Sequence, residues 1–474
     1  MPTKAGIMKL RSVRKSKRLL LLSGLMVTIF LLFSGCTCQR PPAYRIGNPV
    51  MIPDGFGGII VAYQINKGDD LTTYLQRLDA DGEALWDKPG IVLYKAGGNY
   101  GSHFDTRLIS DNQGNYIVIF PQSDSLWAQK LDPEGLYVWQ EDSIQITASP
   151  AHNVEAISDG TGGAIVSYGN DASGSIYDIY VQKVASDGSL LWDNDTPAAW
   201  GRWVRLASDD SGGVLMIWEG EDYDIFAQRL DLNGVPLWGE GLLLSIGINH
   251  RFGEYDIIGD GNGGAVAVWE QDNYLYTKVI DASGGMASDS GTTIGSLYSP
   301  RIISDGSQGY FVFGTRSRAI YAQRLDTAGN VISQETNILV GQSDKRIIYD
   351  IIADNSGNAV IVWGSGIAGN RNKLRAQRMN IDGTTLWDDN GIKVSNVLPY
   401  WGIDFRLARI IPDEDGGYFI SWAAGSGTYS KTSSYIQHVD SNGNLLWGKN
   451  GVLLGPEIRT FLPFSCNHQR SNQA

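Results

Sequence analysis

The chain has 474 residues, of which 42% are apolar and 58 are glycine, and its 51 acidic and 38 basic residues give a formal net charge of −13. An acidic surface repels nucleic acids and anionic membranes, so DNA- or RNA-binding roles are disfavoured. No segment shows a sustained helical period, and glycines between β-branched and aromatic runs indicate many tight turns between short strands.

The N-terminus has the form of a signal peptide. Seven cations precede an uncharged apolar run from Leu19 to Phe33, which is shorter than a membrane span requires. The run ends in Leu32-Phe33-Ser34-Gly35-Cys36, which resembles the lipobox of bacterial lipoproteins. The resemblance implies removal of residues 1–35, lipid on Cys36, and a protein tethered to a membrane of the cell envelope, outside the cytoplasm. The alternative is an ordinary secretory peptide cut near Gly35.

Cleavage before Cys36 leaves 31 basic and 51 acidic residues, a net charge of −20. Residues 36–43 would then form a tether. Two further cysteines, Cys38 and Cys466, stand just before and just after the repeats described next. Every repeat is contiguous in sequence, so we expect no strand exchange to join the chain ends. A Cys38–Cys466 disulfide, permitted in an oxidising compartment, would hold them together instead.

Two short signatures recur eight times each, about 50 residues apart. The first is Asp-x-x-Gly-Gly or a near relative, followed by an apolar run. The second is Gln, a cation and an apolar residue, then a turn glycine and, in most copies, Trp four residues after it. The signature aspartates are Asp54, Asp111, Asp159, Asp209, Asp260, Asp305, Asp354 and Asp413, and the turn glycines are Gly82, Gly135, Gly188, Gly234, Gly284, Gly329, Gly383 and Gly443. These copies define repeats one to eight.

A period of this length with four strand-like runs per repeat predicts an all-β fold, an eight-bladed β-propeller with four antiparallel strands per blade over residues 44–455. Residues 456–474 remain as a C-terminal tail. Repeat four shows the pattern most clearly, with expected strands at Arg202–Ala207, Val214–Trp218, Ile225–Leu230 and around Leu237-Trp238.

Turn lengths distinguish the two faces of the expected ring. The turns between the first and second strands and between the third and fourth are short and alike in every repeat. The remaining connections vary in length, and in an up-and-down blade they share the opposite face. We call these the uniform face and the variable face. Variable loops on a rigid scaffold are where function usually resides, so a binding site is expected on the variable face.

The segment Ala80-Asp81-Gly82-Glu83-Ala84-Leu85-Trp86 resembles the repeat of quinoprotein dehydrogenases and of the lipoprotein scaffold of the outer-membrane assembly machine. The resemblance recurs over most of the chain and implies an eight-bladed fold. Such dehydrogenases usually carry a vicinal disulfide, and this sequence has no adjacent cysteine pair. No cofactor is therefore expected.

Two repeated polar positions have a structural interpretation. Each signature aspartate is followed by glycine, which fits a side chain that caps turn N–H groups rather than a calcium loop. The repeated Gln of the third strand is expected to point inward and tie neighbouring strands together, with the following cation pointing outward. The five histidines show no metal-ligand spacing, so no metal site is predicted.

Aromatic residues that do not repeat between copies stand out in the connections of the variable face. Exposed rings with carboxylates and amides suit a sugar or a peptide partner. The sequence thus predicts a membrane-anchored, non-catalytic module that binds a protein or glycan. The alternative is a glycoside hydrolase with carboxylates at the channel mouth, although no catalytic set is singled out. The candidate ligand-binding residues are Trp200, Trp203, Tyr400 and Trp401, with His103 and His250 as polar companions.

Overall fold

The structure is a computed structural model, and the residues that it describes all lie in one compact unit, Ala43–Ile458. All regular secondary structure in these residues is β-strand. Along the same ranges no helix has the length and apolar character that crossing a membrane would require. The described ranges are 44–46, 49–67, 70–97, 106–122, 125–139, 143–170, 177–192, 197–246, 254–286, 291–307, 309–332, 338–342, 349–354, 356–367, 370–395, 403–426 and 431–455.

The strands follow the repeats in chain order. Repeats one to four contain β2 (Val50–Pro53), β3 (Ile59–Lys67), β4 (Asp70–Leu78), β5 (Ile91–Gly97), β6 (Arg107–Ser110), β7 (Tyr116–Gln122), β8 (Ser125–Leu131), β9 (Ile144–Thr147), β10 (Ala151–Ser158), β11 (Ala164–Asn170), β12 (Tyr177–Val184), β13 (Ala199–Ser208), β14 (Val214–Glu219), β15 (Ile225–Leu230) and β16 (Leu242–Ser245). Repeats five to eight contain β17 (Tyr255–Gly259), β18 (Ala265–Gln271), β19 (Tyr274–Ile280), β20 (Thr292–Gly295), β21 (Tyr298–Ser304), β22 (Tyr310–Arg316), β23 (Ala319–Leu325), β24 (Ile338–Gln342), β25 (Tyr349–Ala353), β26 (Ala359–Ile367), β27 (Asn370–Met379), β28 (Ile392–Lys393), β29 (Ile403–Pro412), β30 (Tyr418–Ser426), β31 (Lys431–Val439) and β32 (Val452–Leu454).

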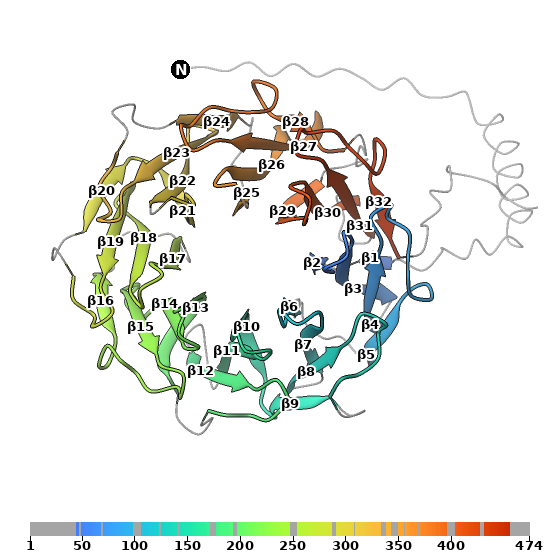
Figure 1. Cartoon of the computed structure of the whole chain (residues 1–474), viewed down its shortest axis with the longest axis horizontal. Helices are drawn as coiled ribbons and strands as arrows, with labels where there is room; N and C mark the ends of the chain where they lie inside the picture. The colour runs from blue at the N-terminus through green and yellow to red at the C-terminus, as the bar shows by residue number, and fades with distance from the viewer. Residues whose placement is uncertain are drawn as a thin grey trace, which may run out of the picture. The chain divides into compact units, whose positions relative to one another are not determined.

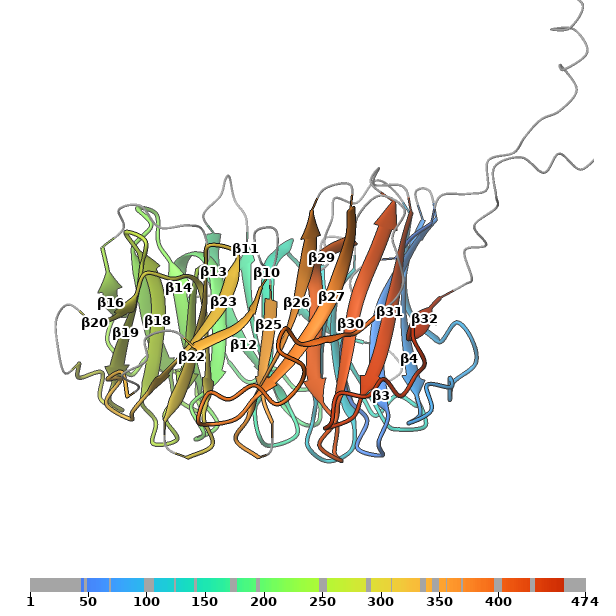
Figure 2. The same cartoon turned by 90° about the horizontal axis from the view of Figure 1, so that it is seen from above.

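Within each repeat the strands form an antiparallel meander, and the sheets stand side by side around a common axis (Figure 1). Figure 2 shows that the strands run through the thickness of this ring, so that the turns gather on its two faces. The innermost strands β2, β6, β10, β13, β17, β21, β25 and β29 each contact the next, and β29 contacts β2. Radially arranged four-stranded antiparallel sheets are the architecture of a β-propeller, as the sequence predicted.

Strand β13 serves two neighbouring repeats. Its start pairs with β12 of repeat three, with Ala199 opposite Ile179, and its end pairs with β14 of repeat four, with Ser208 opposite Val214. The predicted strand Arg202–Ala207 is therefore only the second half of a longer one. The predicted outer strand around Trp238 is wrong, because Trp238 lies in a turn and the outer strand is β16.

A short strand bridges the first and last repeats. Strand β1 (Tyr44–Ile46) pairs antiparallel with β3, with Ile46 opposite Ile65, and parallel with β31, with Arg45 opposite Thr432. The expectation that no strand exchange joins the chain ends is therefore wrong. Backbone hydrogen bonds of β1 connect the seam without a covalent bond. Cys36, Cys38 and Cys466 lie outside the described residues.

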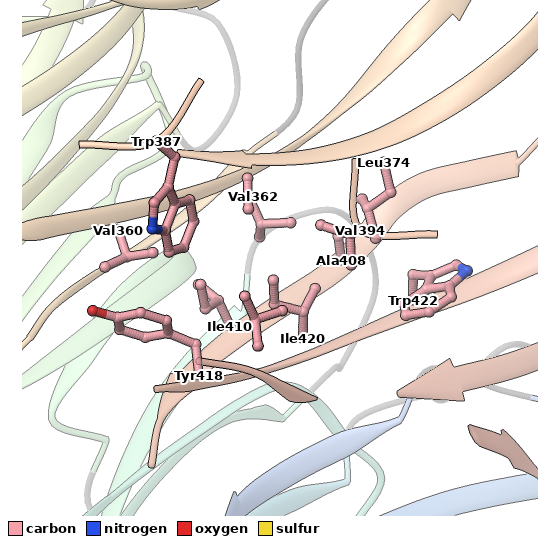
Figure 3. Close-up of a cluster of buried hydrophobic side chains, with 12 residues drawn as sticks. Val360, Val362, Leu374, Trp387, Val394, Ala408, Ile410, Tyr418, Ile420 and Trp422 are labelled. Atoms are coloured by element: carbon pink, nitrogen blue, oxygen red, sulfur yellow. The ribbon is translucent and has the colours of Figure 1, made fainter. Parts of the chain in front are cut away.

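Apolar side chains fill the space between neighbouring sheets. Figure 3 shows the cluster between repeats seven and eight, where Val362 and Trp387 meet Ile410, Tyr418 and Ile420. Every one of these side chains is less than a tenth exposed. Full burial of each aliphatic side chain contributes about 1.5–3 kcal/mol, so stacking of the sheets stabilises the ring more than any single sheet can.

The signature aspartates cap turns, as predicted. The Asp209 carboxylate accepts hydrogen bonds from the N–H groups of Ser211 and Gly213, at 2.9 and 2.8 Å. Gly213 has no room for a side chain, since a Cβ atom there would lie 2.2 Å from the Leu230 carbonyl oxygen. In repeat four this glycine therefore allows the turn to pack closely against the third strand, whereas repeats two and seven have Asn115 and Asn358 at the same place.

The repeated cations were predicted to point outward, and this is wrong. In repeat two the Lys130 ammonium is 3% exposed and lies 2.7 Å from the Asp111 carboxylate, which is fully buried. The same ammonium donates to the Gly162 carbonyl of repeat three at 2.9 Å. The same two contacts, to the capping aspartate of the same repeat and to a backbone carbonyl of the next, are made by Arg77, Lys183, Arg229 and Arg378. Burying an ammonium and a carboxylate costs a large desolvation free energy, which is offset only by paired contacts of this kind.

The repeated Gln has its predicted role of tying strands together. Gln182 donates to the Trp192 carbonyl at 2.9 Å and accepts from the Trp192 N–H at 2.8 Å. The Trp192 indole in turn donates to the Leu232 carbonyl of the next repeat at 3.1 Å. Glutamine and tryptophan therefore connect the third strand to the following turn, and that turn to the neighbouring sheet.

Candidate functional site

The structure describes two of the six predicted ligand-binding residues, Trp200 and Trp203. Both lie on strand β13 rather than in a loop, which corrects the prediction. They stand where the shared strand passes from repeat three to repeat four, at the variable face. The other four predicted residues, His103, His250, Tyr400 and Trp401, lie outside the described residues, so the structure does not test their grouping with the two tryptophans.

Both tryptophans are exposed in a protein that otherwise buries its repeated tryptophans. Trp200 is 52% exposed and Trp203 is 47% exposed, whereas Trp218 and Trp238 are each 4% exposed. Two large apolar rings that stay in water, within four residues of one strand, contribute little burial free energy to folding. Such a pair suggests a surface that another molecule covers.

Trp203 also has an unusual backbone conformation. It lies in a bulge, where the register between β13 and β14 shifts between Arg202 and Arg205, and its φ is 57°. The corresponding bulge positions of repeats three and six hold Asn153 and Ser299, with φ of 52° and 55°. Small polar residues tolerate this conformation, but it is strained for a bulky aromatic one. Strain of this kind concentrates at functional positions.

A third exposed ring, Tyr223, lies on the same face and contacts Arg202, a member of a buried ion pair that the sequence interpretation missed. Arg202 lies beside Glu219, with 2.6 Å between its Nη2 and the Oε1 of Glu219, and both side chains are less than a tenth exposed. The Arg202 guanidinium carbon is 4.7 Å from the centre of the Tyr223 ring. Tyr223 is 39% exposed and sits in the tight turn between β14 and β15, with φ of 66°. We call Trp200, Trp203 and Tyr223 the aromatic cluster.

The neighbouring repeat fixes the backbone under the cluster. The buried Tyr255 hydroxyl of β17 donates to the carbonyl oxygens of Trp203 and Arg202, at 2.6 and 3.2 Å. Burial raises the pKa of Tyr255 well above its ordinary value, with the nearby Glu219 carboxylate adding to the effect, so this hydroxyl keeps its proton. The bulge that presents Trp203 is therefore held from repeat five as well as from repeat four.

The cluster offers flat apolar faces beside a guanidinium and a carboxylate, a chemistry that suits stacking and orientation of a ligand rather than bond cleavage. Among the described residues no group of three or more potential metal ligands comes together. The sequence carried little signal for the missed residues: Glu219, the last residue of β14, is matched by Glu270 in repeat five, and Tyr223 lies in a connection that varies between repeats.

No family model and no curated protein matches the chain. The resemblance of its repeats to quinoprotein dehydrogenases and to the assembly scaffold therefore stays a prediction. Solved structures are similar in fold.

The BP39L lectin from Burkholderia pseudomallei is similar at 10% identity and a TM-score of 0.50, over 74% of this chain and 99% of the lectin. The SapL1 lectin in complex with alpha methyl fucoside is similar at 14% identity and a TM-score of 0.37, over 64% and 96% of the two chains. The polysaccharide lyase Uly1 is similar at 10% identity and a TM-score of 0.41, over 74% and 94%. At this identity the first likeness extends to the fold alone, and the two lower TM-scores support no statement about this chain.

Proposed function

We propose that this chain is a non-catalytic glycan-binding module, built as an eight-bladed β-propeller and tethered to a membrane of the bacterial cell envelope. The observation that carries the proposal is the aromatic cluster, three exposed rings of the variable face beside a buried Arg202–Glu219 pair. Aromatic rings stack on the apolar faces of sugars, and the buried ion pair holds the backbone between the rings in place.

The count of eight blades is supported by two independent observations. The two sequence signatures each occur eight times in phase. The innermost strand of each repeat contacts the next around the ring, and the last contacts the first. A smaller or open arrangement would leave β29 and β2 apart. An experimental structure with a different number of sheets around the axis would contradict this count.

Binding is favoured over hydrolysis by the state of the carboxylates near the axis. A glycosidase needs two carboxylates free to act as acid and as base or nucleophile. Glu155 instead lies between Arg107 and Arg205, at 3.4 and 3.0 Å. Asp350 accepts a backbone hydrogen bond from Ile410 at 3.1 Å. Carboxylates held in contacts of this kind are less free to reach a substrate.

The test is a glycan array followed by calorimetry on any glycan that binds. Trp200→Ala and Tyr223→Ala are each expected to weaken binding by about 1–3 kcal/mol with unchanged melting temperature. Tyr137→Ala is the matched control, because Tyr137 is an aromatic residue of similar exposure, 42%, in a turn of the uniform face. A protein partner in place of a glycan, or product formed from a bound glycan, would overturn the proposal.

The anchor is tested separately. Mass spectrometry of membrane-extracted protein should find a diacyl- or triacylglyceryl group on Cys36 as the N-terminal residue, and Cys36→Ser should move the protein to the soluble fraction. Cys38→Ser is the matched control and should leave the protein on the membrane. Retention of the Cys36→Ser protein on the membrane would show that another segment holds it there.

A further inference from the structure

One position of the innermost strand carries a charge in seven of the eight repeats. It lies four residues before each signature aspartate, and its sign alternates from repeat to repeat around the ring. We call these residues the charge belt. In ring order they are Arg107, Glu155, Arg205, Asp256, Arg301, Asp350 and Arg409, and repeat one has Val50 at this position.

Members of the charge belt contact their neighbours across the gaps between sheets. Glu155 is paired on both sides, 3.4 Å from Arg107 and 3.0 Å from Arg205. Asp256 accepts a hydrogen bond from the backbone N–H of Ile302, the residue after Arg301, at 3.1 Å. Burial raises the pKa of Asp256, and the positive charges of Arg301 and Arg205 partly oppose that rise.

The repeated contact shows what an acid at this position does. Asp350 accepts from the N–H of Ile410 at 3.1 Å, which is the same contact that Asp256 makes to Ile302. Each of these acids therefore reaches the innermost strand of the next repeat and balances the arginines beside it. An acid in repeat one would close the alternation between Arg409 and Arg107.

Repeat one has no such acid. With Val50 in its place the charge belt contains four arginines and three acids, so it carries a net charge of +1 in a chain whose formal net charge is −13. Arg409 is exposed, and its guanidinium donates a hydrogen bond to the adjacent Ala408 carbonyl at 3.2 Å. Among the described residues no carboxylate forms an ion pair with it. Arg107 lies on the other side of Val50 and its guanidinium is 26% exposed.

We propose that this break in the charge belt, formed by Arg409 and Arg107 on either side of Val50, is a binding site for a carboxylate group of a small ligand. A guanidinium presents paired N–H donors that match a carboxylate, and such charge-assisted bonds are stronger than neutral ones. Because the chain as a whole is acidic, the two arginines at this break form a local region near the axis that attracts anions. The carboxylate belongs either to an acidic sugar or to a simple organic acid.

This inference does not depend on the aromatic cluster, which lies on repeat four. The probes are D-galacturonate, succinate and D-galactose, each titrated into the full-length protein in calorimetry at low salt. We expect galacturonate to bind and galactose to give no signal. Succinate that binds as well as galacturonate shows that the carboxylate alone is recognised, and weaker succinate binding assigns the site to an acidic sugar.

Two substitutions test the residues. Val50→Glu supplies the missing acid, and Arg409→Gln removes one of the two guanidinium groups at the break, so each should weaken galacturonate binding by about tenfold or more. Val50→Gln has the same shape as Val50→Glu without its charge and should bind as the unchanged protein does. Arg318→Gln, at an exposed arginine outside the charge belt, should also have no effect. Melting temperatures identify any variant that fails to fold, and the remaining variant then decides.

Three results would overturn the inference. They are equal binding of galactose and galacturonate, no carboxylate binding by the unchanged protein, and undiminished binding by a folded Val50→Glu or Arg409→Gln protein. Trp200→Ala separates the two proposals, since it should leave galacturonate binding at the belt intact. If Trp200→Ala loses glycan-array binding but still binds galacturonate, the two ligands occupy two sites. If it loses galacturonate binding but still binds the array glycan, only the proposed site at the charge belt is refuted.

Discussion

The two faces of the ring differ in whether their contacts repeat. On the uniform face the same contacts recur from repeat to repeat: an aspartate caps a turn, a cation pairs with it, and a tryptophan indole donates to the next repeat. On the variable face the aromatic cluster and the Arg202–Glu219 pair belong to repeat four, and the residues described in the other repeats show no second copy of this combination. A contact that recurs is explained by the need to join identical sheets. A contact that occurs once needs another explanation, and ligand binding is the one proposed here.

The faces also differ in strain and exposure. Trp238 is 4% exposed and its N–H groups bond to Gln228 and to the Ala282 carbonyl, at 2.9 and 3.3 Å. Trp203 is 47% exposed and has a φ of 57°. One tryptophan adds to stability and the other reduces it. The following predictions test that contrast, beginning with the largest expected effect.

Acid should unfold the protein through the uniform face. Although burial alone would raise their pKa values, hydrogen bonds from turn N–H groups and from the repeated cations or neighbouring side chains hold the pKa values of the capping aspartates below the ordinary range. Those for which this holds are Asp111, Asp159, Asp305, Asp354 and Asp413. An aspartate with a lowered pKa contributes stability that is complete above its unfolded pKa, about 3.9, and is lost as pH falls through its folded pKa.

Since five such residues titrate together, the melting temperature should fall steeply below about pH 4. Circular dichroism melts between pH 7 and pH 2.5 would measure this fall. Asp256 of the charge belt has a raised pKa and therefore the opposite sign. Its contribution is lost as pH rises through its folded pKa, so Asp256→Asn should flatten the upper part of the profile. A melting temperature that stays constant down to pH 2.5 would contradict the assigned role of the aspartates.

Trp238→Ala should destabilise the fold by about 3–5 kcal/mol, because it leaves a cavity between repeats four and five and removes the indole hydrogen bond to the Ala282 carbonyl. Chemical denaturation would measure the change in the free energy of unfolding. Leu237→Ala is the control, since Leu237 is the adjacent residue and is 42% exposed. Similar losses for the two variants would show that the repeated tryptophan does not join the sheets.

Lys130→Met should cost about 3 kcal/mol, because it leaves the fully buried Asp111 carboxylate without its partner. Lys130→Arg should fold with near-normal stability, since arginine occupies the same position in repeats one, four, six and seven. Denaturant melts of the two variants at pH 7 make the comparison. An unchanged free energy of unfolding for Lys130→Met would mean that water replaces the cation at little cost.

Trp203→Asn should change the free energy of unfolding least among these substitutions, and the change should be stabilising. Asparagine tolerates positive φ, and repeat three already has Asn153 at this place with φ of 52°. The variant should be as stable as the unchanged protein or more stable by up to about 1 kcal/mol, while glycan binding is lost. Trp200→Ala should lose binding with no gain in stability. A destabilised Trp203→Asn protein would indicate that the exposed ring packs rather than binds.

The sequence by itself determined the repeat architecture. Capping aspartates, turn glycines and the tying role of the repeated Gln could be predicted because each depends on residues close in the chain or on β-alternation. Gly212, for example, has a φ of 85° that its own turn requires. The same local logic failed at the outer strand of repeat four, which pairs with β15 further along the chain than predicted, and at the start of β13, which pairs with β12 of the neighbouring repeat.

Only the tertiary structure decided which way the repeated cations point, how the first and last repeats are joined, and where the residues of the two proposed sites lie. Lys130 is buried rather than outward because its partners Asp111 and Gly162 come from an earlier turn and from another repeat. Strand β1 closes the seam only because the ring brings β31 beside it. The charge belt is visible in the sequence as one position before each signature aspartate. Its contacts could not be predicted, because charges 45 or more residues apart in the sequence become neighbours only when the ring closes and the innermost strands meet around the axis.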